Sequence, residues 1–360
     1  MEKAEERNQK IIDAVLQKES LLCPGAVDLI GVYGSFLSGD VHPLSDLDLL
    51  IVSDDARAQA LSCTFLQEDP LIGHDLYITS WQSLQEDAAY PDPHIAKLMK
   101  AKILYSSAPE HLARLETLRR QAQFLLDAPF GAEDLRKAEA TLKEAMSFYA
   151  QAMTEASLTG VRKNAGGALS YLEDAVAMLN KAYFTRGTKR RLAELIGMAR
   201  RPEHLCEEIA AVAEAKDLPS LRETLTLLMQ DVQRCFSRER ELLHHAAGIA
   251  GGSIAGTYEE MVSNWRGKMR LAAENGDAHL AFLSLASLQG MLDDLHASAG
   301  IGEYDAFSVY HPEDLLKTAE ELDLFLAEYA KEYRRAGLTV RRYPDIDAFT
   351  EDYLGNGSRE

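Results

Sequence analysis

The sequence predicts an α+β protein, in which a small sheet-containing domain is followed by domains built only from helices. Two observations predict this class. Apolar runs rich in β-branched residues occur only in the first third of the chain, and the rest carries apolar residues at helical spacing. Strands confined to one end, followed by a long series of helices, are typical of α+β folds or of separate domains. With 360 residues, the chain is long enough for two or three domains.

The first third of the chain carries the predicted sheet. A helix is expected over 3–19, with apolar positions such as Ile11 and Val15, and Pro24 with Gly25 ends it. Strands are expected over 27–32, 47–52 and 75–79. From about Trp81 onward the pattern predicts helices almost throughout.

The remaining two thirds divide at a Gly-rich stretch. Before it, helical spacing covers 134–154, 165–184, 189–198, 202–215 and 220–245. Residues 246–253 are small and Gly-rich, which favours a linker, and three more helices are expected over 258–275, 278–298 and 312–336. The predicted domains are therefore 1–127, 128–250 and 256–360.

Composition indicates the cellular compartment of the protein and the kinds of partner that it can bind. The chain has 57 acidic residues against 38 basic ones, a net charge of -19, which disfavours a nucleic-acid partner and suits a cationic one. Its four cysteines form no C-x-x-C pair, so a reduced, cytoplasmic setting is expected and no zinc site. The charged N-terminal residues do not resemble a signal peptide, and no apolar run approaches the about 20 residues of a membrane span.

The chemically informative stretch runs from Gly34 to Val52. Gly34 permits close approach of the backbone to a ligand, and turn amides such as that of Ser35 suit phosphate oxygens. Asp46 and Asp48 are two residues apart at the start of a strand, so their carboxylates share one face. A carboxylate within the apolar strand that holds Asp48 is costly unless it is paired or bound to a cation.

Two carboxylates beside a phosphate-binding turn predict a site for Mg²⁺ and a triphosphate. Magnesium prefers oxygen ligands and is often held by one or two carboxylates together with phosphates. The chemistry would be in-line displacement at phosphorus. Asp75, at the expected start of an adjacent strand, is the candidate third ligand, and a surface carboxylate is the alternative reading.

This stretch resembles the signature of the nucleotidyltransferase superfamily. Gly34-Ser35 is followed after ten residues by Asp46, and Asp46-Leu47-Asp48-Leu49 repeats the alternation of aspartate and apolar residue. The resemblance implies the mixed sheet of the DNA polymerase beta-like nucleotidyltransferase fold. It also implies that Asp46, Asp48 and Asp75 bind two divalent metal ions and that Gly34 and Ser35 hold the nucleotide phosphates.

Two further residues are assigned to the nucleotide site. Ser45, directly before Asp46, matches the motif, and Lys97 could reach a triphosphate as a point charge. A solvated helix face is the alternative for Lys97. The basic residues Arg186, Lys189, Arg190 and Arg191 could bind pyrophosphate or RNA, or flank the start of a helix. His42, His74 and His94 are expected to be loop and surface residues.

A second resemblance covers roughly 140–236. The segments 177–185, 192–194 and 202–206 are similar to the helical second domain of kanamycin-type aminoglycoside nucleotidyltransferases. In those enzymes a glutamate on an early helix of this domain deprotonates the sugar hydroxyl. The aligned residue here is Phe148, which argues against a kanamycin-type acceptor. Glu144, one turn away on the same face, is the predicted base, and Glu173 and Asp75 are alternatives.

The predicted function is transfer of a nucleoside monophosphate from a nucleoside triphosphate to a hydroxyl of a small acceptor, with release of pyrophosphate. An antibiotic is one candidate acceptor, bound between the first and second domains. Two alternatives stay open. One is a regulatory nucleotidyltransferase that modifies a protein or RNA partner, and the other is a binding module with a degenerate nucleotide site.

Overall fold

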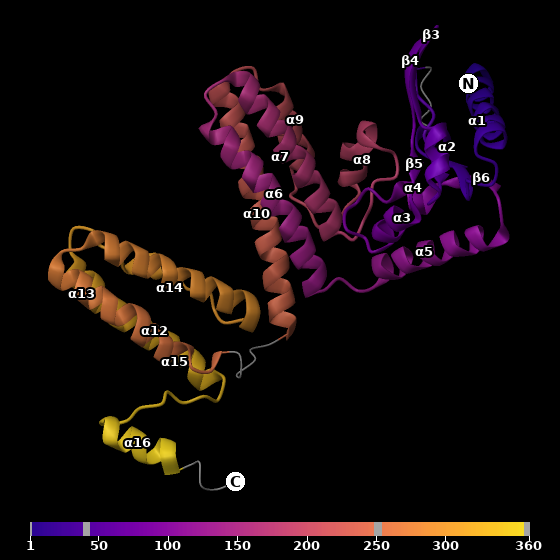
Figure 1. Cartoon of the computed structure of the whole chain (residues 1–360). Coiled ribbons are helices and arrows are strands. Elements are labelled where there is room, and N and C mark those ends of the chain that lie inside the picture. The colour runs from indigo at the N-terminus through magenta and orange to yellow at the C-terminus, as the bar shows by residue number, and fades with distance from the viewer. Residues whose placement is uncertain (1, 39–43, 248–253, 356–360) are drawn as a thin grey trace. The chain divides into compact units, whose positions relative to one another are not determined.

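The computed structural model describes residues 2–38, 44–247 and 254–355, and it divides into two compact units, 1–239 and 240–360 (Figure 1). The loop residues 39–43, with Asp40 and His42, and residues 248–253 of the expected linker lie outside the described residues. The predicted boundary near residue 127 falls inside the first unit and stays a prediction.

A four-stranded mixed sheet forms the centre of the first part of unit 1. Its order is β5-β2-β1-β6, with β1(Leu29–Val32) antiparallel to β2(Leu49–Val52) and to β6(Lys102–Ser106), while β5(Ile78–Thr79) runs parallel to β2. Every residue of β1 and β2 is buried. Strands covered on both faces need continuous apolar runs, which these two segments supply. The mixed sheet and the α+β class are thus confirmed.

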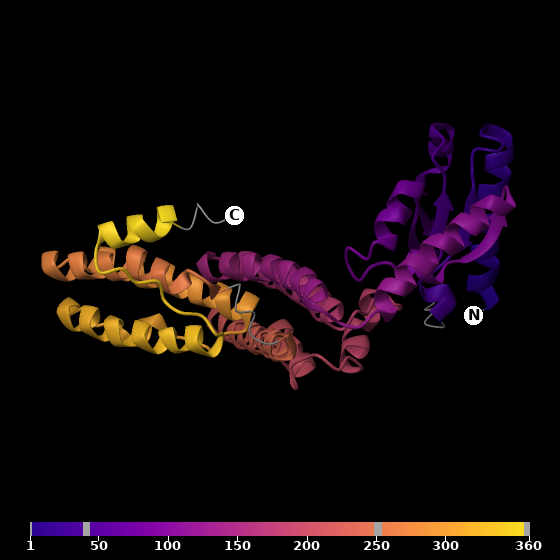
Figure 2. The same cartoon turned by 90° about the horizontal axis from the view of Figure 1, so that it is seen from below.

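Helices cover both faces of this sheet (Figure 2). On one face, α1(Glu2–Leu22) and the 3-10 helix η1(Ala56–Leu61) join a core that contains Ile12, Val15, Leu61 and alternate residues of β1 and β2. The alternation of strand side chains sends Leu29 and Leu50 to the opposite face. The short helices α3(Trp81–Ala88) and α4(Ala96–Lys100) pack against the long helix α5(Pro109–Asp127).

The third predicted strand is wrong in its extent, and two other strands were not expected. Residues 75–79 are divided between β4(Leu71–Leu76) and β5, and β4 pairs with β3(Cys63–Glu68) in a separate two-stranded sheet. Asp75 is therefore near the end of β4, whereas the strand beside β2 begins at Ile78. Antiparallel pairing with β3 makes β4 the second arm of a hairpin, and the alternation of exposed and buried residues along β4 shows that one of its faces is buried. Strand β6 also breaks the helical pattern expected after Trp81.

The rest of unit 1 is helical. It comprises α6(Ala132–Thr154), α7(Leu158–Leu179), η2(Thr188–Arg190), α8(Arg191–Ile196), α9(Leu205–Glu214) and α10(Leu218–Ala247) as far as Glu239, and the end of α10 belongs to unit 2. The helices α6 and α7 pack along one another, and Gly167 of α7 leaves room for the ring of Phe148. The hydrogen bonds that tie this part to the sheet part include one from Tyr90 Oη to the Ala182 carbonyl (2.6 Å) and one from Phe184 N to the Pro93 carbonyl (3.0 Å).

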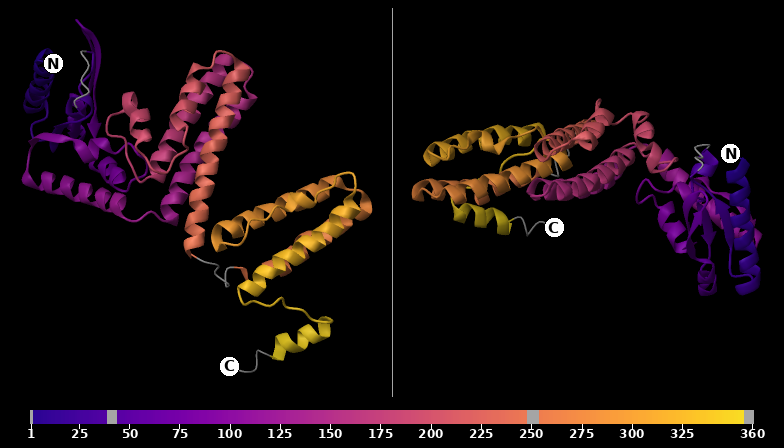
Figure 3. Two further views of the ribbon diagram at one scale, coloured as in Figure 1. Left: turned by 180° about the vertical axis from the view of Figure 1, so that it is seen from behind. Right: turned by 90° about the horizontal axis from the view of Figure 1, so that it is seen from above.

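Unit 2 consists of helices with their own apolar core. Its elements are α12(Thr257–Met261), the π-helical turn η3(Val262–Arg266), α13(Gly267–Asn275), α14(Ala278–Ala299), η4(Ala306–Val309), α15(Leu315–Arg335) and α16(Ile346–Gly355). Helix α13 packs against both α14 and α15 (Figure 3). The buried core contains Tyr329 and Tyr333 and draws only on residues of this unit. Among the described residues, no helix is long and apolar enough to cross a membrane.

Candidate active site

The turn after β1 brings the backbone against a carboxylate. Gly34 has a φ of +70°, a left-handed conformation that glycine adopts without steric cost. A Cβ atom at this position would overlap the carboxylate of Asp48. Two features therefore favour glycine at position 34. One is its left-handed backbone conformation, and the other is the close approach of Asp48. Helix α2(Ser35–Ser38) begins at the next residue.

Asp46 and Asp48 lie directly before β2. The backbone N–H of Tyr33 donates to the Asp48 carbonyl (3.1 Å), which continues the contact between the two central strands. The Asp48 carboxylate accepts a hydrogen bond from the Ser35 backbone. Asp46 is exposed, whereas Asp48 is partly buried. The residue pair therefore stands at the edge of the sheet beside the Gly34 turn.

The electrostatics of Asp48 favour a bound cation. Burial, and then the negative charge of Asp46, raise the pKa of Asp48 to about 6, although Lys189 and the Ser35 amide act in the opposite direction. Burial and the hydrogen bond between the hydroxyls of Tyr33 and Tyr77 (2.7 Å) raise the pKa of Tyr33, and the charges of Asp48 and Asp46 add smaller contributions in the same direction. A divalent cation would relieve this crowding of negative charge, and carboxylate oxygens are suitable ligands for Mg²⁺.

Asp75 is near Asp46 but does not complete a three-ligand set. Both residues line one pocket, whose other lining residues belong to β3 and β4. The Asp75 carboxylate accepts a hydrogen bond from Thr64 Oγ1 (3.0 Å). Within 2–38, 44–247 and 254–355, no three acidic, histidine or cysteine side chains gather closely enough to hold a metal ion. The structure thus brings Asp46 and Asp48 together and leaves Asp75 bonded to the hairpin.

Comparison with known proteins agrees with this geometry. Residues 9–105 match a protein family described as "Nucleotidyltransferase domain". This stretch is a nucleotidyltransferase domain. Across the whole chain, the structure is similar to a nucleotidyltransferase-like protein from Exiguobacterium sibiricum, with 10% sequence identity, 92% of this chain and 94% of that chain covered, and a TM-score of 0.36. No curated protein sequence matches the chain.

The two other predicted nucleotide contacts are held within the nucleotidyltransferase domain. Ser45 is 2% exposed, and its carbonyl accepts a hydrogen bond from Arg7 Nη2 of α1 (2.6 Å). Lys97 Nζ forms an ion pair with Asp87 of α3 (3.3 Å). Ser45 thus fixes the segment that leads into Asp46. For Lys97, nothing among the described contacts joins it to Asp48.

Lys189 is the cation whose charge acts on Asp48 of the nucleotidyltransferase domain. It lies in η2, is exposed, and lowers the pKa of Asp48. The loop before η2 is fixed by Glu194, whose carboxylate accepts from the backbone N–H groups of Thr185 and Arg186 (both 2.8 Å). The basic run 186–191 was the sequence signal for this residue, but it did not distinguish Lys189 from its neighbours.

Arg191 has a different role from Lys189. Its guanidinium forms ion pairs with Glu173 and Asp174 of α7 (both 3.3 Å) and lies 4.9 Å from the ring centroid of Phe184. Burial raises the pKa of Glu173, and Arg191 partly offsets this rise. Asp174 also pairs with His94 Nε2 (2.9 Å). Arg191 therefore joins α8 to α7 within a largely buried group of charges.

The two glutamates considered as bases have different surroundings. Glu144 is exposed on α6, and none of the described contacts involves its side chain. Phe148, one turn further, stacks on Tyr171 with ring centroids 5.7 Å apart. Glu173 pairs with Arg191, two residues after Lys189, so contacts connect it to the segment whose charge acts on Asp48.

His74 was not expected to be buried. It is 1% exposed, stacks on Phe65 with ring centroids 4.9 Å apart, and lines the same pocket as Asp46 and Asp75. The expectation of a surface histidine was wrong because position 74 falls on the inward face of β4, a strand that was not placed there. Burial lowers the pKa of His74, and the positive charge of Arg7 lowers it further.

Proposed function

We propose that the protein transfers a nucleoside monophosphate from a nucleoside triphosphate to a hydroxyl of a small acceptor and releases pyrophosphate. The observation that supports this most directly is the crowding of Asp48 between Gly34, the Ser35 amide and Asp46, within a nucleotidyltransferase domain. Such crowding of negative charge suits a site that binds Mg²⁺ together with a nucleotide.

In the proposed reaction, the acceptor oxygen forms a bond with the α-phosphorus and the bond from that phosphorus to the bridging oxygen breaks. Pyrophosphate leaves with the bridging oxygen, and the hydroxyl proton passes to a base. A bound Mg²⁺ would neutralise phosphate charge and orient the attacking and leaving oxygens. Asp46 and Asp48 would hold the metal, with Asp75 as a further ligand after rearrangement of its bond to Thr64. Gly34 and Ser35 would contact the phosphates.

The Ser35 amide has a second task in this proposal. Because it donates to the Asp48 carboxylate, it fixes the orientation of that carboxylate before any ligand binds. The positive charge of Lys189 acts on Asp48 and would attract the triphosphate as a point charge. Both effects prepare the site for a polyanionic substrate accompanied by a cation.

The base is proposed to be one of two glutamates, and substitution separates them. Glu144 lies one turn from Phe148, the residue aligned with the base of kanamycin-type enzymes, whereas Glu173 has a raised pKa and contacts the segment next to Lys189. Replacing the true base with glutamine should lower kcat by about 100-fold and remove the acid limb of its pH profile. Glu144→Gln and Glu173→Gln should therefore be compared across pH. If both retain the acid limb, neither residue is the base.

The acceptor is proposed to be a small, cationic, hydroxyl-bearing molecule, since the net charge of -19 favours approach of a cation. Purified protein with Mg²⁺ and labelled ATP should be incubated with aminoglycosides, lincosamides and a cell extract, and products examined by mass spectrometry. The proposal predicts an acceptor whose mass rises by one nucleoside monophosphate, with one pyrophosphate released per adduct. Label found only on protein or RNA would instead favour the regulatory alternative, and no adduct with any nucleotide would favour a degenerate binding module.

A further inference from the structure

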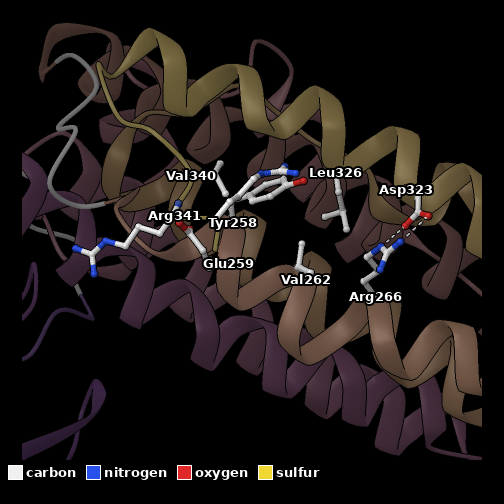
Figure 4. Close-up of a pocket in the computed structure, with 9 residues that line it drawn as sticks. Tyr258, Glu259, Val262, Arg266, Asp323, Leu326, Val340 and Arg341 are labelled. Atoms are coloured by element: carbon white, nitrogen blue, oxygen red, sulfur yellow. Dashed lines mark hydrogen bonds and ion pairs between the residues drawn. The ribbon is translucent and has the colours of Figure 1, made fainter. Parts of the chain in front are cut away.

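A second pocket lies wholly within unit 2. Helical residues from Tyr258 to Arg266 form one wall, Asp323 and Leu326 of α15 form another, and the segment 340–342 closes it (Figure 4). Its volume of about 550 Å³ is in the range of small-molecule sites. All its lining residues belong to the second unit, so it is separate from the Asp46 and Asp48 site.

The Glu259 carboxylate fixes the segment 340–342 by a hydrogen bond to its backbone. Glu259 accepts hydrogen bonds from the Arg341 backbone N–H (2.8 Å) and from Tyr333 Oη (3.0 Å). Burial alone would raise the pKa of Glu259, but these hydrogen bonds outweigh burial and leave the pKa below its usual value. Glu259 is therefore ionised and occupied in fixing the backbone beside the pocket.

At the opposite end, the lining residues Arg266 and Asp323 form an ion pair, to which Arg270 adds a second guanidinium from outside the lining. Asp323 accepts from Arg266 Nε (2.6 Å) and from Arg270 Nη2 (2.6 Å), so one carboxylate serves two guanidinium groups. The π-helical turn that contains Val262 and Arg266 forms part of the pocket wall that runs from Tyr258 to Arg266. Such turns are rare and frequently occur at functional sites.

Among the described residues that line the pocket, Arg342 has a guanidinium group without an ion-pair partner. In the part of the chain that the structure describes, its side chain has no hydrogen-bond or ion-pair partner, and the residue is exposed. Arg341 differs, since its side chain extends away from the other labelled residues (Figure 4). A guanidinium binds a carboxylate, phosphate or sulfonate through paired hydrogen bonds.

The middle of the pocket is apolar. Val262 and Leu326 face one another across it, with Tyr258 beside them (Figure 4). An apolar body with one anionic group would match both the apolar middle and the cationic rim. We propose that this pocket of unit 2 binds a small molecule with an apolar or aromatic body and one oxyanion group, and that Arg342 holds the oxyanion.

The test uses the full-length protein and two fluorescent probes with the same rings. Anilinonaphthalene sulfonate carries an anionic group, and phenylnaphthylamine lacks it. The proposal predicts that Arg342→Ala weakens binding of the sulfonate by about tenfold and leaves binding of the neutral probe unchanged. Arg334→Ala removes an exposed arginine outside the pocket and should leave both affinities unchanged.

Further variants locate the bound probe. Asp46→Asn with Asp48→Asn should bind the sulfonate as the wild type does, because the pocket is separate from the carboxylate pair. A bulky side chain in the middle of the pocket, as in Val262→Trp, should exclude both probes. The proposal is overturned if the wild type does not bind the sulfonate, or if Arg342→Ala and Arg334→Ala bind it equally well.

Discussion

Asp48 is held in a position that suits ligand binding more than it suits stability. Its carboxylate is partly buried, faces the charge of Asp46, and touches a glycine that no larger residue could replace. Because burial and Asp46 raise its pKa to about 6, the folded protein without metal holds a proton there more tightly than the unfolded chain does. The resulting stabilisation is complete below the unfolded pKa near 3.8 and is lost as the pH rises through about 6.

Asp48→Asn should therefore stabilise the metal-free protein. At pH 8 the free energy of unfolding should rise by up to about 2–3 kcal/mol, and the gain should vanish near pH 4. Urea denaturation at several pH values measures this. Adding Mg²⁺ should stabilise the wild type and not the variant, because only the wild type retains the charged ligand. Equal stability of both proteins at pH 8, with and without Mg²⁺, would contradict the assignment.

At the scale of elements, α8 is attached to α7 through charge. Arg191, Glu173 and Asp174 have side chains that are 13%, 13% and 12% exposed. Removing the cation would leave two largely buried carboxylates next to one another, and breaking buried ion pairs in this way is strongly destabilising. The attachment also fixes the segment with Lys189 relative to Asp48.

Arg191→Met should lower the free energy of unfolding by about 3 kcal/mol, measured by urea denaturation. Arg136→Met is the matched control, because Arg136 and its partner Glu133 have side chains that are 66% and 64% exposed. That control should leave the unfolding midpoint unchanged. Equal midpoints for Arg191→Met and the wild type would show that the charge group does not attach α8.

The elements also show which features the sequence encodes locally. The apolar runs and the Gly34-Ser35 to Asp48 spacing sufficed to place β1, β2 and the central carboxylate pair. Strand β6 was missed because Lys102–Ser106 follows a helical pattern, and only its pairing with the distant β1 makes it a strand. The charge of Lys189 acts on Asp48 through packing of distant segments, which no local pattern contains.

At the scale of the whole molecule, the two compact units have separate interiors. The core around Tyr329 and Tyr333 draws only on unit 2, and the core beside the carboxylate pair draws only on residues of the sheet part. A chain that ends after Ala247, where α10 ends, should therefore fold and melt cooperatively. Circular dichroism during heating measures this. Aggregation, or a melt without a cooperative transition, would show that unit 1 depends on unit 2.

The most direct test of the central claim is the rate of Mg²⁺-dependent nucleotidyl transfer, measured as pyrophosphate released in the presence of an acceptor identified by mass spectrometry. Asp46→Asn with Asp48→Asn should lower this rate by about 100-fold or more, since ligand loss removes the metal as well as its orientation. Asp13→Asn changes an exposed carboxylate of α1 and should retain the full rate. An unchanged rate in the double variant would contradict the assignment of Asp46 and Asp48 as the metal-binding pair.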